Sequence, residues 1–227
     1  MSISSLQETY GFQNPFNVDA LAKKALRYLD KGGDLLDVGC GEGADSVFFA
    51  NRGFRVTAID ANLEDLDRLR AYRRNEHIER ISILERDAVT YRYRPDRHDV
   101  INCLLVICCM RKSEFERMLG PLQRSVKPGG VIIMSSRNYL DPEFKEYRSS
   151  EKMIEPNTFR KKDGKCKHLY FIEKNRLREV FDDFEILYYY EGFAPCKYDE
   201  HPKHGDSYII CRRKGHGDTE SPRRFKH

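Results

Sequence analysis

The sequence lacks the features that would place the protein in a membrane or in an export pathway. No apolar run approaches the ~20 residues that a membrane-spanning helix needs. The N-terminus, MSISSLQETYGF, lacks the basic and then apolar segments of a secretory signal peptide. We therefore expect a cytoplasmic protein without a membrane partner. The chain also shows no internal repeat.

Paired cysteine motifs are absent as well. The chain contains 7 cysteines, an odd number, and no C-x-x-C pair occurs among them. Several stand inside apolar runs, where a cysteine is usually a small core residue. This usage predicts reduced thiols, with neither a disulfide framework nor a zinc or other metal site. The group from Cys103 to Cys109 is interpreted as core, with contact to a soft, polarisable ligand as the alternative.

The chain carries no strong excess of charge of either sign. Its 40 basic and 36 acidic residues leave a net charge of +4, which by itself implies neither a nucleic acid nor an anionic membrane as partner. With 227 residues, 40% of them hydrophobic, the chain is long enough for one sizeable core. We expect a single domain over residues 1–214 and a disordered polar tail over 215–227.

Segments that read as strands alternate with segments that read as helices. The strands are apolar almost throughout, which indicates an α/β fold with a parallel sheet covered on both faces. The last two strands have no obvious helix between them, so they can pair antiparallel. The expected strands are DLLDV, FRVTAID, RISILERD, DVINCLLVICCM, VIIMSS, FEILYYYEG and DSYIICRR.

Three helices have boundaries that the sequence suggests. Asn62 is placed to cap a helix with a leucine stripe. Ser113, with Glu116 three residues later, is typical of a capping box at the start of another helix. A third helix is expected near residues 173–182.

The alternation is interrupted between residues 137 and 172. This segment is polar and shows no long apolar period, and long irregular stretches inside a compact domain are usually functional or disordered. Because it follows the fifth strand, we expect it to cap a pocket at the carboxyl edge of the sheet. The N-terminal segment from Tyr10 to Phe16 is expected to join it as a lid, with simple core packing as the alternative. The apolar anchors of the cap are Tyr139, Phe144, Tyr147 and Phe159.

A glycine-rich loop, LLDVGCGEGAD at residues 35–45, follows the first strand. Gly39, Gly41 and Ala44 fit the G-x-G-x-x-G/A pattern of dinucleotide-binding proteins, and Asp60 ends the next strand. Asp37 argues against a dinucleotide, because its carboxylate would face the pyrophosphate, and like charges ~4 Å apart repel by about 1–4 kcal/mol. A triphosphate would meet the same repulsion, and the loop lacks the G-K-[ST] of a P-loop.

S-adenosylmethionine fits the D-x-G-x-G loop better, because it carries an ammonium and a sulfonium and no phosphate. Asp60 can bind both ribose hydroxyls, and Asp87 can accept from the adenine amino group. Each acid alone is more often a helix cap or turn residue. Three acids at the ends of successive strands favour a cofactor site. The candidates for cofactor binding are Asp37, Gly39, Cys40, Gly41, Asp60, Ala61, Asp87, Ala88, Asn102 and Cys103.

The pattern resembles the class I S-adenosylmethionine-dependent methyltransferases over residues 17–213. The motifs that carry the resemblance are LLDVGCGEGADSVFFA, VTAID, ERDA, DVINCLLV and KPGGVIIM. The resemblance implies a doubly wound, Rossmann-like sheet of seven strands, mostly parallel, with the last strand antiparallel. It also implies a cofactor site built from Gly39, Gly41, Asp60, Asp87 and the start of the fourth strand.

The last third of the chain resembles the small-molecule branch that includes TehB-like tellurite-resistance and thiopurine-type enzymes. In the TehB-like group, a stretch with histidine and arginine precedes the last strand; here it holds His201, Lys203 and His204. The resemblance implies a small acceptor such as a chalcogen or metalloid oxyanion, or a thiol. His201 or His204 can act as a base, or both are exposed loop residues. Arg137 either faces an anionic acceptor or is a surface charge.

Two other classes of function remain as alternatives. RNA or protein methylation is suggested by the basic tail and by FRKK, but nucleic acid is not favoured. The fourth strand lacks [ND]-P-P-[YF], and no Pro-Cys marks a cytosine nucleophile. The second alternative is a catalytically silent binding or scaffold subunit that keeps the cofactor fold.

Overall fold

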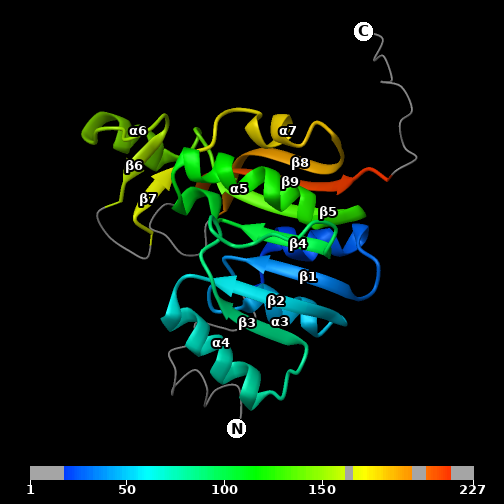
Figure 1. The fold of residues 1–227 in the computed structure, drawn as a ribbon. Helices are drawn as coiled ribbons and strands as arrows, with labels where there is room; N and C mark the ends of the chain where they lie inside the picture. Colours follow the sequence, from blue (N-terminus) through cyan, green and yellow to red (C-terminus); the bar gives the residue numbers. More distant parts are fainter. Residues whose placement is uncertain (1–17, 162–165, 196–202, 216–227) are drawn as a thin grey trace.

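The computed structural model describes residues 18–161, 166–195 and 203–215. A twisted sheet runs through the middle of the molecule, with helices on both of its faces (Figure 1). Three predictions fall outside the described residues: His201, the N-terminal lid from Tyr10 to Phe16, and the tail after Gly215.

The main sheet has seven strands in the order β3-β2-β1-β4-β5-β9-β8. Neighbouring strands from β3 to β5 are parallel, whereas β9 runs antiparallel to both β5 and β8. The doubly wound, mostly parallel sheet with an antiparallel last strand is therefore confirmed. Its strands are β1 Gly33–Val38, β2 Phe54–Asp60, β3 Ile81–Glu85, β4 His98–Leu104, β5 Val126–Arg137, β8 Phe184–Pro195 and β9 Lys203–Arg213.

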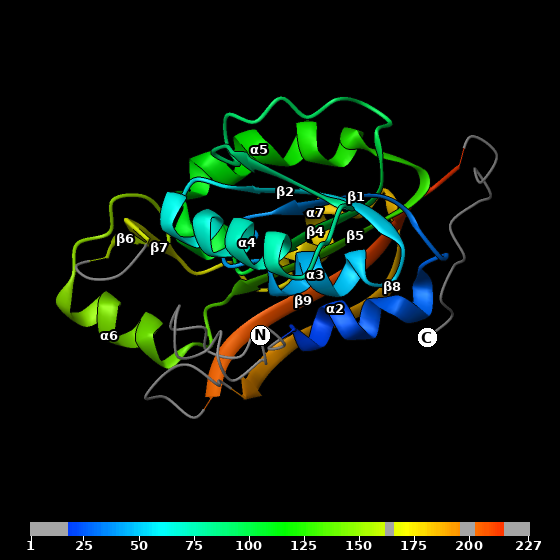
Figure 2. The same cartoon turned by 90° about the horizontal axis from the view of Figure 1, so that it is seen from below.

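Alternating strand residues supply two apolar cores, one on each face of the sheet. Leu35, Val100 and Ile133 belong to the core beneath α2, α3 and α4, while Leu36 and Ile101 belong to the core beneath α5 and α7. In Figure 2, α5 lies on one side of the sheet and α2 and α3 on the other. These helices are α2 Ala20–Ala25, α3 Ala44–Ala50, α4 Leu63–Asn75, α5 Lys112–Ser125 and α7 Arg176–Val180.

The segment between residues 137 and 172 is more regular than its sequence suggests. It holds helix α6, Pro142–Ser150, and a small antiparallel pair, β6 Thr158–Arg160 and β7 His168–Tyr170. These elements are too short to show a clear periodicity in the sequence. The four expected anchors lie in one apolar cluster with Phe171. Figure 1 places this group beside the end of the sheet to which the arrowheads of β1 and β4 point.

Helix ends follow the sequence in one case and depart from it in two. Asn62 caps α4, since its side-chain oxygen accepts from the backbone of Glu64 and Asp65. The expected capping box of Ser113 and Glu116 is wrong, because the N-cap of α5 is Arg111, two residues earlier. There Glu114 accepts from Arg111 N at 2.7 Å, while the hydroxyl and amide of Ser113 donate to Glu155. The helix expected near 173–182 is limited to Arg176–Val180.

The expectation that all cysteines are reduced thiols is wrong for one pair. Cys109 and Cys166 form a disulfide that joins the short helix η2, Ile107–Cys109, to the chain just before β7. The two residues are 57 positions apart, so no local spacing rule reveals the pair. The other described cysteines, Cys40, Cys103, Cys108 and Cys211, are unpaired.

The described segments contain no group of three or more His, Cys, Asp or Glu side chains that could hold a metal ion. None of the helices that the structure describes is long and apolar enough to cross a membrane.

Candidate cofactor and acceptor site

The loop after β1 owes its path to glycines with left-handed backbone geometry. Gly39 and Gly41 have φ angles of 65° and 52°, a region that side chains rarely tolerate. A Cβ on Gly39 would lie 2.4 Å from Cγ2 of Val106, so the backbone must pack closely there. A Cβ on Gly41 would meet nothing within 4 Å, so its backbone faces open space. The loop therefore presents an accessible backbone at Gly41.

Asp37 lies beneath this loop as a buried, fully hydrogen-bonded acid. Ser46 Oγ donates to one carboxylate oxygen at 2.5 Å, and Asn102 Nδ2 donates to the other at 2.9 Å. Burial raises the pKa of Asp37 to about 6, against the lowering effect of these two hydrogen bonds. Oδ1 of Asn102 is buried without a hydrogen-bond partner among the described groups. Asp37 and Asn102 thus form the polar floor of the site.

Asp45, at the start of α3, is a second acid near the floor that the sequence analysis did not single out. Asp19 N donates to its carboxylate at 2.9 Å, and Asn102 Nδ2 lies 3.5 Å from its other oxygen. Burial, together with the charge of Asp37, raises the pKa of Asp45 to about 7. The sequence signal that was available is its place just after the last glycine of the loop.

Asp60 ends β2 and contacts the glycine loop directly. Its Oδ2 accepts from Gly41 N at 2.9 Å, and its Oδ1 accepts from Asn62 N at 2.8 Å. A carboxylate oxygen has a further lone pair, so both oxygens can still accept from a ligand. Ala61, which follows, is exposed.

Asp87 and Ala88 lie in the turn beyond β3. Oδ1 of Asp87 accepts from the backbone of Val89 and Thr90, which is the turn-residue role weighed as its alternative. The carbonyl of Ala88 accepts from the hydroxyl of Tyr93 at 2.9 Å. One Asp87 oxygen therefore holds the turn, and the geometry is compatible with a ligand at the other.

The two cysteines expected near the cofactor differ in position. The thiol of Cys40, in the loop, contacts the carbonyl of Gly41 at 3.6 Å, and burial raises its pKa well above the usual value. Cys103 is fully buried in the core beneath α5, the opposite face from Asn102, because successive strand residues alternate. Its burial agrees with the interpretation of this cysteine as a core residue, and its thiol is on the face away from the polar floor.

The acceptor-side candidates Arg137 and His204 lie together at the end of β5 and the start of β9. His204 is buried; its Nδ1 lies 3.0 Å from Oδ2 of Asp141, and its Nε2 lies 3.5 Å from Arg137 Nη2. Arg137 also forms an ion pair with Glu143. A guanidinium can only donate, so in a hydrogen bond between these two groups Nε2 of His204 is the acceptor. Neither residue has the exposed position weighed as its alternative.

Asp206, opposite Arg137 in the β5–β9 register, is an acid that the sequence analysis missed. It is 7% exposed, and its Oδ2 accepts from the hydroxyl of Tyr208 at 2.9 Å. Its Oδ1 is buried and has no hydrogen-bond partner in the described part of the chain. Burial raises the pKa of Asp206. The available signal was the spacing of two between His204, Asp206 and Tyr208 just before an apolar run.

These polar groups share one face of the sheet. Asp37 and Asn102 follow the residues of β1 and β4 that enter the core beneath α3, at a spacing of two. By the same alternation, Arg137 lies on the same face as Ile133 in β5, and Asp206 lies on the same face as Ile210 in β9. All of them lie at the carboxyl edge of the parallel strands, where open α/β sheets bind ligands.

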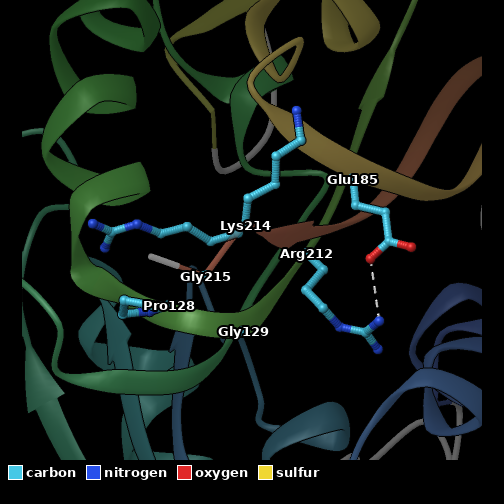
Figure 3. A pocket seen from close by; sticks show the side chains of 7 residues that line it. Pro128, Gly129, Glu185, Arg212, Lys214 and Gly215 are labelled. Atoms are coloured by element: carbon cyan, nitrogen blue, oxygen red, sulfur yellow. Dashed lines mark hydrogen bonds and ion pairs between the residues drawn. The ribbon is translucent and has the colours of Figure 1, made fainter. Parts of the chain in front are cut away.

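A basic depression of about 470 Å³ lies at the opposite edge, near the starts of β5 and β8 (Figure 3). Arg212 pairs there with Glu185 at 3.3 Å, and Arg213 pairs with Asp96 at 2.6 Å. In Figure 3 the charged ends of Arg212 and Lys214 point away from each other. The basic residues at the end of β9 therefore lie at the edge of the sheet opposite the polar groups described above.

Comparison with known sequences identifies the central part of the chain. Residues 35–130 match the family model described as a methyltransferase domain. The ubiquinone biosynthesis O-methyltransferase of Rickettsia bellii is 32% identical over 127 residues, which is 55% of this chain and 51% of that protein. The enzyme of the same name from Aeromonas salmonicida is 29% identical over 129 residues, again 55% and 51%. The chain spans about half the length of the curated relatives it matches.

Comparison with solved structures agrees on the fold. TehB from Haemophilus influenzae superposes with a TM-score of 0.70 and 17% identity, over 92% of this chain and 66% of that one. The 1,6-didemethyltoxoflavin-N1-methyltransferase of Burkholderia thailandensis, solved with bound 1,6-didemethyltoxoflavin and S-adenosylhomocysteine, has a TM-score of 0.65 and 13% identity, over 93% of this chain and 85% of that one. The central part of the chain therefore matches a methyltransferase domain, and the described chain shares the fold of these solved methyltransferases.

Proposed function

We propose that the chain transfers a methyl group from S-adenosylmethionine to a small-molecule acceptor. One observation carries the proposal. At the carboxyl edge of the sheet, the open glycine loop is hydrogen-bonded to Asp60, because Gly41 N donates to its carboxylate at 2.9 Å. Relatives of the matched domain are named as methyltransferases.

The chemistry of the site fits this cofactor and not a phosphate-bearing one. Asp37 is buried and Asp45 is partly buried beneath the loop, and a pyrophosphate would be repelled by their charge. An ammonium and a sulfonium would be stabilised instead. We assign the ribose hydroxyls to Asp60 and the adenine amino group to the second oxygen of Asp87. The backbone of Gly41 would lie against the cofactor.

The residues of the chain would act mainly by binding and orientation. When bound, the cofactor supplies an activated methyl group on a positively charged sulfur. The loop and Asp60 hold the donor side, and the polar groups of β5 and β9 hold the acceptor side of the same face. Bringing two reactants into line on one rigid surface accounts for much of the acceleration of a displacement reaction. The cap of α6, β6 and β7 would exclude water from it.

The acceptor classes expected from the sequence are a chalcogen or metalloid oxyanion and a thiol. The ion pair of Arg137 with Glu143 weakens the case for an oxyanion, because the cation is already balanced. The matched relatives are named for transfer to oxygen, and a structural neighbour is named for transfer to nitrogen. We therefore retain a small organic molecule as the acceptor and treat the oxyanion as the less supported case.

The two rival functions have weaker support. The basic residues expected to attract a nucleic acid, such as Arg212 and Lys214, lie at the edge opposite the polar face. A silent scaffold has no need for a buried acid with an unpaired oxygen, such as Asp206. Turnover with any acceptor would exclude the silent alternative.

Titration calorimetry on the full chain tests the cofactor directly. S-adenosylmethionine and S-adenosylhomocysteine should both bind, whereas NAD should not. Binding of NAD, with no heat or thermal shift from S-adenosylmethionine at millimolar concentration, would overturn the proposal. A following screen of hydroxyl compounds, amines, thiols, tellurite, selenite, arsenite and transfer RNA would then identify the acceptor.

A further inference from the structure

Asp206 is a buried acid on the acceptor side, and one of its oxygens has no partner. Its Oδ2 accepts from Tyr208, whereas its Oδ1 is buried and receives no hydrogen bond from a described group. Native proteins satisfy nearly all buried polar atoms, so an orphaned carboxylate oxygen calls for an explanation. This oxygen is therefore able to accept a hydrogen bond from a bound ligand.

We propose that Asp206 binds the methyl acceptor and removes its proton, and that the acceptor is therefore a neutral compound with an acidic hydroxyl group. The inference rests on the proposed methyltransferase function and extends it to the chemistry of the acceptor.

The position of Asp206 allows this role. It pairs in register with Arg137, the last residue of β5, and β5 in turn pairs with β4. Because β9 runs antiparallel to β5, its first half lies at the carboxyl edge with the cofactor loop. Asp206 also lies on the same face of the sheet as Asn102, which contacts Asp37 at 2.9 Å.

The charges around Asp206 favour a neutral acceptor. Arg137 is engaged by Glu143 and by His204, so its positive charge is shared. Asp141 is fully buried within the same group. An oxyanion would therefore meet the carboxylates of Asp206 and Asp141, and like charges in a buried site repel strongly.

The unpaired oxygen of Asp206 also favours an acceptor that donates a strong hydrogen bond. A hydroxyl makes a short, strong hydrogen bond to a carboxylate, whereas a thiol is a weak donor. Tyr208, which donates to the other oxygen, stacks against Tyr190 with ring centroids 5.7 Å apart. Flat aromatic surface beside the acid suits a ring-bearing hydroxyl compound, so a phenol is the natural first probe.

The step balances without any further reactant. A bond forms between the acceptor oxygen and the methyl carbon, and the bond between that carbon and the sulfur breaks. The electron pair of the broken bond stays on sulfur, and the hydroxyl proton passes to Oδ1 of Asp206. The proton then returns to solvent when the methylated product leaves.

The role requires an ionised Asp206, which makes the rate depend on pH. Burial raises the pKa of Asp206, and the hydrogen bond from Tyr208 lowers it. Activity should therefore fall as the pH falls through the pKa of this carboxyl group. The groups that interact electrostatically with Asp206 are Tyr208 and His204 on β9, Arg137 on β5, Asp141 before α6 and Cys108 in η2.

The test uses the full chain, a panel of phenols and three variants. Asp206→Asn should lower kcat by about 10²–10⁴-fold, the usual contribution of a general base. Asp206→Glu should recover part of that loss. Tyr208→Phe should move the acid limb of the pH profile to higher pH, because the carboxylate loses a stabilising hydrogen bond. Asp183→Asn, an exposed aspartate beyond α7, is the matched control and should match the wild type.

A second readout separates this inference from the proposed function. Calorimetry should show that Asp206→Asn binds S-adenosylhomocysteine as the wild type does but binds the phenol in that complex more weakly. If the wild type binds no cofactor, the proposed function fails. If it binds cofactor but methylates only thiols or oxyanions, or no hydroxyl compound, the inference about Asp206 is overturned. It is also overturned if Asp206→Asn keeps the wild-type rate and pH profile. If that variant does not fold, the pH shift of Tyr208→Phe decides.

Discussion

Gly41 N donates a hydrogen bond to Oδ2 of Asp60 at 2.9 Å, so the loop after β1 and the acid at the end of β2 form one unit. The other oxygen of Asp60 accepts from Asn62 at 2.8 Å, which joins the same acid to the start of α4. The backbone of the loop and the orientation of the carboxylate are therefore set together. A change at either position should affect cofactor binding more than it affects the fold.

Asp60→Ala should weaken binding of S-adenosylhomocysteine by about 1–3 kcal/mol, the value of lost hydrogen bonds to a charged group. Titration calorimetry measures the loss. Asp67→Ala removes an exposed aspartate of α4 that pairs with Arg70, and it should leave binding unchanged. Equal affinities for both variants and the wild type would remove Asp60 from the cofactor site.

Two glycines of the loop should respond differently to alanine. Gly39→Ala places a Cβ 2.4 Å from Val106 at a φ of 65°, so it should lower the free energy of unfolding by about 1–3 kcal/mol. Gly41→Ala has free space around its Cβ and should cost about 1–2 kcal/mol from its left-handed backbone alone. Its added methyl group would occupy the space proposed for the cofactor. Thermal unfolding of both variants should show the larger loss of stability for Gly39→Ala. Calorimetry should show that Gly41→Ala loses more cofactor affinity, relative to its loss of stability, than Gly39→Ala does.

Asp37 and Asp45, the two acids beneath the loop, should make stability depend on pH. The folded-state pKa of Asp45 is raised to about 7 and that of Asp37 to about 6, both above the ordinary aspartate value of 3.8. A raised carboxyl pKa means that the folded state binds the proton more tightly, so its stabilisation is fully present below about pH 4 and is lost as the pH rises through 6 to 7.

Melting temperatures of the wild type, measured between pH 4.5 and 8, should therefore decline as the pH passes through the pKa values of Asp37 and Asp45. Asp45→Asn should flatten the decline, because one of the two titrating groups is gone. Asp67→Asn serves as the exposed control and should keep the wild-type slope. A wild-type curve that is level across the window would contradict the raised pKa values.

The sequence alone predicted the parts of the fold that rest on continuous local patterns. Five nearly uninterrupted apolar runs identified the parallel strands, and the glycines with Asp60 indicated the edge at which we propose that the cofactor binds. It failed where distant segments decide the outcome. Glu155, in the cap, accepts a hydrogen bond from the hydroxyl of Ser113. Cys166 forms a disulfide with Cys109, which lies 57 positions away in the sequence. Asp206 became visible only when the β5–β9 register set it opposite Arg137.

The cap predicted over residues 137–172 can be tested through its apolar cluster. Phe159 is fully buried there against Phe144, Tyr147 and Phe171, so Phe159→Ala should cost about 3–5 kcal/mol of local stability. Hydrogen exchange should then be faster across residues 137–172, while exchange in β1 and β2 stays close to the wild type. Met153→Ala, an exposed change in the same segment, should leave the exchange pattern unaltered.

The functional consequence of the cap follows from its place at the carboxyl edge. If it closes over a small acceptor, S-adenosylhomocysteine should slow exchange in residues 137–172 of the wild type. In Phe159→Ala it should do so less, and turnover of a small acceptor should fall while cofactor affinity holds. The disulfide between Cys109 and Cys166 ties the segment before β7 to η2, so Cys166→Ser should act in the same direction with a smaller effect. Equal exchange with and without the demethylated cofactor, together with unchanged turnover in Phe159→Ala, would refute the cap, and a macromolecular acceptor that needs an open edge would then be the better proposal.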